Sequence, residues 1–483
     1  MTRINTNISA LQAIRNLQRN SEDLTLRLER LSTGLRINRG RDDPAGLIAS
    51  ERLRFEISAT HQAIKNSARA NNVIATTEAS LNETNSLILD LQALVVEAAN
   101  KGALTSEEIN ANQLQIDSIL ESIDRIANTT TFGSKKLLDG SGAYNLSSVP
   151  TTALASVSVF AARIPQAAKR TVTVTVTQSA QTARLSFIGS NTAGVSTTSA
   201  ATIEVQGNLG TEIVAFTSGT TFKDVVATIN SLKPSTGISA VVSSPGVGGV
   251  ASAVLMNTTN YGSDALVSVT PISGNFIVTG NNNTELRSNG VNAGVLVDGQ
   301  KAFVNGLRAD VRTGGLDTQL HLTPTFAQSL SAASFTITGG GTLFQLTPEV
   351  SVNGQVHFGF NSVRTTQLGN TIVGRLHTLR SGEANDLASQ NFLNAQQIIQ
   401  ETIGQVSSYR GRLGNLQRNT IDPNINSQGV ALENVTASES VIRDADMAEE
   451  LSVLTRAQIL VQSTQSTLQI ANSIPNLVLS LLS

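Results

Sequence analysis

The chain has 483 residues, enough for roughly three domains of average size. Lys and Arg total 34 against 36 Asp and Glu, and a net charge of -2 argues against a nucleic-acid binder held by a broadly basic surface. Cysteine is absent, which excludes disulfides, thiolate metal sites and cysteine nucleophiles. Aromatic residues make up only 4%, so a core must rely on many small aliphatic contacts, which favours long helices or thin sheets.

Apolar residues near the N-terminus recur at the spacing of a coiled-coil seam. The pattern stops at Thr33-Gly34 and begins again at Asp43-Pro44, where aspartate can cap a new helix and proline fits its first turn. This predicts a break at 33–43 and a second helix that continues to Lys101. The seam residues are Ile4, Ile8, Leu11, Ile14, Leu17, Leu24, Leu28, Leu31 and Leu35.

The chain then changes from helical to strand composition. A capping box from Thr105 to Glu108 predicts a third helix, antiparallel to the second. Between about residues 140 and 380 the composition shifts to Thr, Ser, Val and Gly, with strict alternation from Thr171 to Thr177. This zone is therefore expected to be mostly strand.

The last hundred residues return to helical composition, with an apolar stripe that includes Leu454, Val461 and Leu468. Residues 1–41 carry eight Arg and three acidic residues, whereas residues 441–483 carry two Arg and four acidic residues. Because a lone amphipathic helix cannot bury its stripe in water, we expect the two terminal helices to pair into one discontinuous rod with the β zone inserted. The alternative is two independent helical bundles joined by a β domain.

No motif points to catalysis, a metal or a cofactor. The four histidines lack zinc-site spacing and no phosphate-binding loop is present, so we expect a protein that is not an enzyme. Asp42-Asp43 resembles a carboxylate pair, but its position at a helix start favours capping. Arg36, Arg39 and Arg41 form either a small anion site or a solvated loop.

The sequence also lacks the usual targeting signals. No run approaches the ~18 apolar residues of a membrane helix, and the N-terminus has no signal-peptide pattern. We therefore expect no membrane span and no export by the general secretory route.

Ordered motifs at both ends of the chain resemble those of bacterial flagellins, the subunits of the flagellar filament. At the N-terminus these are INTNI at residues 4–8 and LSTGLRINRGRDDPAGL at 31–47. At the C-terminus they are RLGNLQ at 412–417, IRDADM at 442–447, RAQIL at 456–460 and IPNLVLSLL at 474–482. Family members usually continue a helix through the region of Pro423, so a helix start or kink is expected here instead.

The resemblance implies an α+β fold, in which a long α-helical coiled-coil rod made from both termini carries an inserted β-rich outer domain. Residues 201–242 are similar to the ββαβ insertion motif of flagellins and hook-associated proteins. The implied domains are 1–43 and 441–483 for the inner-tube helical domain, 44–164 and 341–440 for the outer-tube helical domain, and 165–340 for the inserted surface-exposed domain.

The resemblance further implies a subunit that polymerises with itself into an extracellular flagellar filament for motility. Its expected partners are the flagellar type III export apparatus, an export chaperone, and the filament cap and hook-junction proteins. The expected inter-domain loop residues are Arg36, Asn38, Arg41, Asp42 and Asp43. The expected polymerisation interface consists of Ile4, Ile8, Leu11, Leu17, Leu24, Leu28, Leu31, Leu35, Leu454, Val461, Leu468, Leu477 and Leu479.

One further expectation rests on departures from the family. Flagellins seen by the vertebrate Toll-like receptor for flagellin carry an arginine in a Leu-Gln-Arg-Val-Arg-Glu-Leu strip and a glutamate on the neighbouring helix. Those positions align here with Asp90 and Gln115, while Leu94 is retained. A reversed charge opposite a receptor acid should cost at least as much as losing the pair, so weak or no receptor activation is expected.

Two alternatives stay open from the sequence. A hook-filament junction protein shares the terminal helices, although it generally departs from the motifs found here. A filament protein whose residues 165–340 act as an adhesin or glycan-binding module is the alternative from a different functional class.

Overall fold

The computed structural model describes residues 6–100, 102–164, 169–188, 200–243, 253–276, 278–279 and 286–482. The chain divides into two compact units that each bring together segments far apart in the sequence. The first contains Met1–Ala70, Gln345–Gln355 and Arg418–Ser483, and the second contains Asn71–Phe344 and Val356–Gln417. Within the described residues, no helix combines the length and apolar content needed to cross a membrane.

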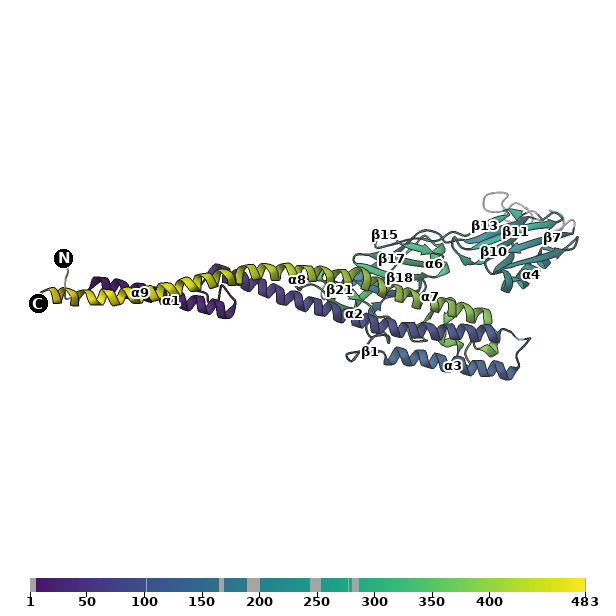
Figure 1. The fold of residues 1–483 in the computed structure, drawn as a ribbon. Helices are drawn as coiled ribbons and strands as arrows, with labels where there is room; N and C mark the ends of the chain where they lie inside the picture. The colour runs from purple at the N-terminus through teal and green to yellow at the C-terminus, as the bar shows by residue number, and fades with distance from the viewer. Residues whose placement is uncertain are drawn as a thin grey trace. The chain divides into compact units, whose positions relative to one another are not determined.

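Helices from both chain ends build the first unit. Helix α1 (Ile8–Thr33) packs along α9 (Met447–Leu482), and the unit also contains the first part of α2 (Pro44–Ala98) and α8 (Asp422–Arg443) (Figure 1). Asn7 caps α1, and Gly34 ends it with a left-handed φ of 73°. The predicted break, the restart at Pro44 and the pairing of the terminal helices are confirmed.

Pro423 lies where the sequence suggests a helix start. A π-helical turn spans Gln417–Ile421, and α8 begins at Asp422 with the proline in its first turn. The backbone stays helical across the junction, with Ile421 at φ -78° and ψ -49°, so the proline lies just after a π-bulge within a continuous helix and not at a free helix end.

Two further helices belong to the second unit, together with the end of α2. Helix α3 (Ser106–Thr129) starts with both hydrogen bonds of the predicted capping box, and a short hairpin follows it, β1 (Thr131–Phe132) and β2 (Lys135–Lys136). Asp124 of α3 accepts hydrogen bonds from the backbone and hydroxyl of Thr365, both at 2.8 Å. Helix α7 (Phe392–Leu416) is preceded by 3-10 turns at Leu376–Leu379 and Leu387–Ser389.

Two antiparallel sheets share one apolar core in the second unit. The alternation predicted at Thr171–Thr177 is confirmed, because Val172, Val174 and Val176 are buried and the threonines between them are not. The first sheet has the order β15 (Gln300–Lys301), β14 (Gly294–Val297), β5 (Arg170–Gln178), β19 (Ala332–Gly340) and β3 (Tyr144–Ser147). The second sheet has the order β16 (Phe303–Asn305), β17 (Arg308–Thr313), β18 (Leu316–Leu322) and β4 (Leu154–Ala162). The short helix α6 (Pro324–Gln328) follows β18.

A second apolar core lies within residues 183–278. The chain enters and leaves this region through a bridge in which Gln181 and Val291 exchange two backbone hydrogen bonds of 2.9 Å. One of its sheets has the order β12 (Val278–Thr279), β6 (Thr182–Ile188), β10 (Ala253–Tyr261) and β9 (Ile238–Ser243). The other has the order β13 (Arg287–Asn289), β11 (Leu266–Ser273), β7 (Ala201–Gln206) and β8 (Thr211–Phe216). The region also contains helices α4 (Phe222–Ser231) and α5 (Lys233–Thr236). The predicted ββαβ order is thus present from β7 to β9.

The expected class, α+β with long helices from both termini around a β-rich middle, is confirmed. The boundaries at 165 and 340 stay predictions. They cut through connected sheets, since β4 pairs with β18 and β3 pairs with β19. The remaining short strands are β20 (Thr342–Gln345), β21 (Gln355–Phe358), β22 (Gly369–Asn370) and β23 (Gly374–Arg375).

Candidate self-association surface

The seam between α1 and α9 is built from small and medium side chains. Ala10 and Ala13 on α1 and Ala457 and Ala471 on α9 are buried, as is Leu454. Alanines at such positions let two helix backbones approach closely. Leu17, Leu24, Leu31 and Leu35 on the N-terminal side and Val461 and Leu468 on α9 are half-buried.

Polar contacts fix the register of the two helices. Asn7 Nδ2 donates to the carbonyl of Ala471 at 2.7 Å. Glu450, only 6% exposed, forms ion pairs with Arg27 at 3.2 Å and Arg30 at 3.0 Å. The arginine-rich N-terminal helix and the acidic C-terminal helix therefore contact each other through this buried ion pair. If α9 were shifted along α1 by one helical turn, Glu450 would be left buried without a partner.

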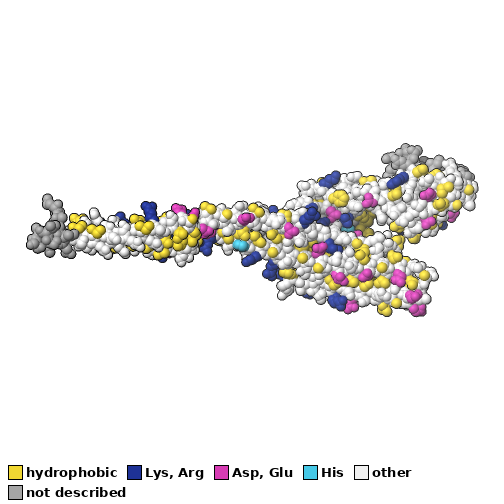
Figure 2. All heavy atoms as spheres, viewed as in Figure 1, with side chains coloured by type: hydrophobic (Ala, Val, Ile, Leu, Met, Phe, Trp, Pro, Cys, Tyr) yellow, Lys and Arg dark blue, Asp and Glu magenta, His cyan; other side chains and the backbone are white. Residues whose placement is uncertain are grey.

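A second apolar stripe on the same two helices is not covered by their pairing. Its members are between 39% and 63% exposed: Ile8, Leu11, Ile14, Leu28, Leu451, Ile459, Leu460, Ile470 and Ile474. Figure 2 shows hydrophobic side chains at the surface along these terminal helices. The predicted interface residues thus separate into two sets, one facing the partner helix and one, including Ile8, Leu11 and Leu28, facing outward. Ile4 lies outside the described residues, as do the side chains of Leu477 and Leu479.

The predicted inter-domain loop at 34–43 is held by its own hydrogen bonds. Arg36 anchors it, because its guanidinium donates to the carbonyl of Ile442 at 2.6 and 3.2 Å and its amide to that of Arg443 at 2.7 Å. The Asn38 side chain donates to the carbonyl of Leu35 at 3.0 Å. These contacts join the loop to the end of α8 within the first unit.

The two aspartates of the loop have different roles. Asp42 accepts backbone hydrogen bonds from Arg39 and Asn38, and these bonds, with the nearby Arg41, hold the pKa of the Asp42 carboxyl below its ordinary value. Asp43 accepts from the amide of Gly46 at 2.8 Å at the start of α2. The capping interpretation is therefore confirmed for Asp43, whereas Asp42 bonds back to the loop and does not cap α2.

The three loop arginines point to different partners. Arg36 contacts a carbonyl, Arg39 pairs with Glu29 at 3.0 Å, and the side chain of Arg41 is 72% exposed. Since they do not converge on one point, they do not form the small anion site that the sequence left open.

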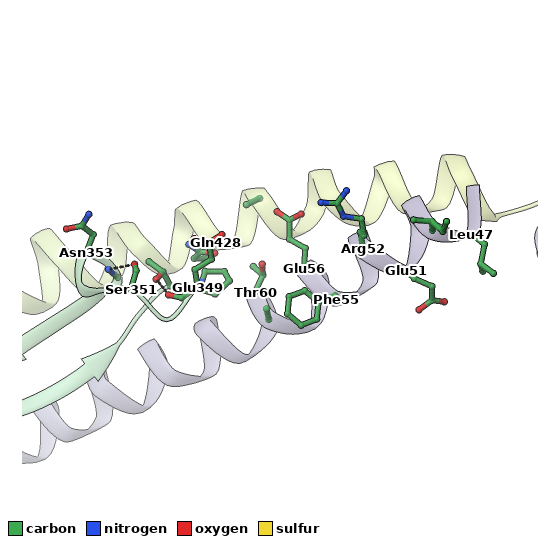
Figure 3. Close-up of a pocket in the computed structure, with 16 residues that line it drawn as sticks. Leu47, Glu51, Arg52, Phe55, Glu56, Thr60, Glu349, Ser351, Asn353 and Gln428 are labelled. Atoms are coloured by element: carbon green, nitrogen blue, oxygen red, sulfur yellow. Dashed lines mark hydrogen bonds between the residues drawn. The ribbon is translucent and has the colours of Figure 1, made fainter. Parts of the chain in front are cut away.

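A groove in the first unit was not predicted from the sequence (Figure 3). It has a volume of about 1200 Å³ and lies between the start of α2, the 347–354 turn and two residues of α8. Phe55, 77% exposed, projects into it, and Ile48 one heptad earlier is 65% exposed. The isolated aromatic residue at heptad spacing from another apolar residue was the available sequence signal.

The charged lining of the groove is mostly acidic. Glu51, Glu56 and Glu349 line it together with Arg52 (Figure 3). Glu51 is paired with Arg54 at 2.8 Å, outside the groove lining. Exposed apolar side chains with a polar rim are typical of protein interaction surfaces, so the groove adds to the candidate self-association surface.

The candidate receptor strip lies on the second unit. Asp90 on α2 and Gln115 on α3 are exposed, and Leu94 is half-buried. The structure therefore leaves the two departing side chains accessible, and whether a receptor contacts them stays a prediction.

A buried charge cluster in the second unit was also missed by the sequence analysis. Arg412 of α7 pairs with Asp317 and with Asp310, the latter at 2.8 Å, and its guanidinium lies 4.3 Å from the centre of the Phe160 ring. His321 Nε2 lies 3.4 Å from Glu401 Oε1. No sequence signal joins these residues, because α7 and strand β18 come together only in the folded chain.

Comparison with known proteins agrees with this arrangement. The bacterial flagellin N-terminal helical region matches residues 4–143, and the C-terminal helical region matches residues 396–482. A flagellin from Clostridium tyrobutyricum is 29% identical, covering 97% of this chain and 98% of its own. A flagellin from Salmonella muenchen is 27% identical with 99% of both chains covered.

The likeness to solved structures is much weaker. The flagellar cap protein from Bdellovibrio bacteriovorus is 18% identical and covers 38% of this chain and 94% of its own, with a TM-score of 0.27. Such a score adds nothing to the assignment. The two terminal matches and the full-length relatives carry it: the chain belongs to the bacterial flagellin family.

Proposed function

We propose that the outward stripe of α1 and α9 is the surface through which this filament subunit polymerises. As a flagellin, the protein is a structural subunit of the extracellular flagellar filament. The observation that carries the interface proposal is the set of large apolar side chains left exposed on helices whose inner faces are already paired. An isolated chain would hold this stripe in water, and contact with further copies would remove it.

The terminal helices then have two tasks. Their small-residue seam holds one subunit together, while the stripe around Leu28, Ile459 and Ile470 binds its neighbours. The groove at Phe55 would extend the contact to α2. Residues 1–43 and 441–483 would form the inner tube, residues 44–164 and 341–440 the outer tube, and the inserted β domain would face solvent.

Partners outside the homopolymer are proposed from the family resemblance. The chain would leave the cell through the flagellar type III export apparatus with a dedicated chaperone. In the finished flagellum it would meet the cap protein at one end and the hook-junction proteins at the other. The full-length flagellin relatives favour the filament subunit over a junction protein or an adhesin.

The proposed interface is tested by seeded polymerisation of a variant in which two exposed isoleucines of the outward stripe are replaced. Ile459→Ser with Ile470→Ser removes two side chains that are 60% and 63% exposed, so helicity and melting temperature of the monomer should change little. Because each defect repeats along the polymer, elongation should fall at least tenfold, measured by electron microscopy and light scattering.

The matched control is Gln462→Ser with Gln469→Ser, two exposed polar positions on the same helix. It should elongate at the normal rate. Normal elongation by the isoleucine variant, with an unchanged monomer, would overturn the assignment of the outward stripe.

Weak activation of the Toll-like receptor for flagellin is proposed from the exposed Asp90 and Gln115. In a reporter assay with purified monomer, Asp90→Arg with Gln115→Glu should raise the signal by roughly tenfold or more, since pairing charges replaces repulsion. Glu83→Arg, which places an arginine at another exposed acid of α2, is the control for added positive charge on that helix. A parent signal already equal to that of a flagellin bearing the arginine strip would contradict the proposal.

A further inference from the structure

A polar pocket of about 480 Å³ lies in the second unit, away from the terminal helices. One wall is residues 155–159 of strand β4, which ends its sheet and pairs on one side with β18. The other walls come from residues 139–146 and from the segment 361–375. The volume falls in the range of sites for small organic ligands.

Two hydrogen-bond donors in this lining are buried without a partner. They are Nε of Arg364 and Nδ2 of Asn361. Among the described residues, the Arg364 guanidinium makes no salt bridge and no hydrogen bond to the protein. A buried donor that lacks an acceptor is costly, so these two atoms mark the part of the lining whose polar groups are least satisfied by the protein itself.

A second arginine, Arg375, lines the same pocket and has guanidinium N–H groups that are not used in hydrogen bonds among the described residues. Arg375 uses its Nη1 atom to donate to the carbonyl of Thr366 at 2.8 Å, and within the described residues its other guanidinium nitrogens are not engaged. Two guanidinium groups in one lining can hold a planar oxyanion through paired N–H bonds.

The charges of the lining do not cancel. Asp139 is the acidic residue among the lining side chains, and it accepts the amide of Ser141 at 2.9 Å. Burial raises the pKa of the Asp139 carboxyl, but the Ser141 bonds and the charges of Lys136 and Arg364 lower it further, so the net direction is down and the carboxylate is ionised at neutral pH. Two arginines against one aspartate leave one positive charge.

We propose that this pocket binds a small, singly charged carboxylate that also carries hydroxyl groups. Its carboxylate would lie against Arg364 and Arg375, and its hydroxyls would meet the Ser156 and Ser158 side chains and the Asp139 carboxylate. Water could fill the volume but would bring no negative charge to the arginines. A phosphate group, with about 1.5 to 2 negative charges, would be repelled by Asp139.

Titration of the full-length monomer with glucuronate tests the proposal, with calorimetry and ligand-observed NMR as readouts. We expect saturable binding of one molecule per chain. Arg364→Gln should weaken it roughly tenfold, about 1.4 kcal/mol, with only a small change in melting temperature, because what the side chain loses is a longer-range attraction to Asp139 and not an ion pair. Arg125→Gln, which removes an exposed arginine of α3 in the same unit, should bind normally.

Three neutral or simpler probes sharpen the result. Glucose should not bind, because it lacks the charge, and acetate should bind more weakly than glucuronate, because it lacks the hydroxyls. Inorganic phosphate binding more tightly than glucuronate would overturn the carboxylate assignment. Absence of saturable glucuronate binding at millimolar concentration, or equal binding by Arg364→Gln, would overturn the site itself.

Discussion

The terminal helices and the β-rich middle differ in how completely they bury their apolar side chains within one chain. Strands of the middle close their own cores, so that Val172, Leu320 and Ile337 are fully buried within one chain. Helices α1 and α9 pair with each other and still leave side chains such as Ile8 and Ile470 more than half exposed. The cores of the middle are therefore complete within one subunit, while the proposed interface would cover the apolar side chains that the helices leave exposed.

The largest loss of stability in the middle is expected from breaking its buried charge cluster. Arg412→Met keeps the side-chain stem but removes the closer partner of Asp317, which is 7% exposed, and leaves it only Arg312 at 3.6 Å. Breaking a buried ion pair by removing one partner costs about 3–5 kcal/mol. Hydrogen exchange of β17 and β18 should speed up accordingly, while seeded elongation per folded subunit should stay normal.

Arg456→Met is the control for this substitution, since Arg456 is exposed on α9. It should leave exchange in β17 and β18 unchanged. Unaltered protection of these strands in Arg412→Met would show that the cluster does not hold α7 to the sheet.

A smaller effect is a pH dependence confined to the middle. Burial of His321, helped by Arg308, lowers the pKa of the imidazole below its ordinary 6.5, although Glu401 and Asp310 act in the opposite direction. The unfolded chain therefore binds the proton at a higher pH than the folded chain, and stability is lost as pH falls below about 6.5. Protection of β18 should decline over that range.

His321→Gln should flatten this pH profile, measured by hydrogen exchange between neutral pH and pH 5. His61→Gln removes an exposed histidine from α2 and should leave the profile as it was. A profile that rises on acidification in the parent protein would contradict the assigned direction of the pKa.

The smallest expected effect tests whether filament assembly depends on the second apolar core, within residues 183–278. Replacing residues 182–290 by a short Gly-Ser linker joins Gln181 to Val291, which already exchange backbone hydrogen bonds. The remaining sheets stay whole, so filaments should elongate at close to the normal rate.

Removing 165–340 is the matched comparison. That deletion takes β5, β18 and β19 and leaves β3 and β4 without partners, so it should express poorly or aggregate. Failure of the 182–290 deletion to polymerise when well folded would mean that the region of the second apolar core makes obligatory filament contacts.

Much of the helical architecture could be predicted because its signals are local. Gly34, Pro44 and the Thr105 capping box mark helix ends through backbone chemistry that acts within a few residues. The alternating threonines and valines of β5 predict a half-buried strand in the same way. Motif similarity at the two ends then gave the family without any structure.

The division of the seam could not be predicted, because heptad spacing does not say which of two neighbouring stripes meets the partner helix. Leu24 and Leu28 look equivalent in the sequence, yet the first is half-buried and the second is 49% exposed. The angle at which α9 lies on α1 separates them, and that angle depends on residues more than 400 positions apart.

Composition, periodicity and local motifs were therefore enough to predict the helices at both chain ends, the strand-rich middle, the family and the filament role. Only the tertiary structure decided which apolar side chains stay outward, that Arg412 meets Asp317, and that Arg364 and Arg375 share one pocket. Those features join segments distant in the chain, and the contacts between such segments are set by packing of the whole fold, which no local pattern encodes.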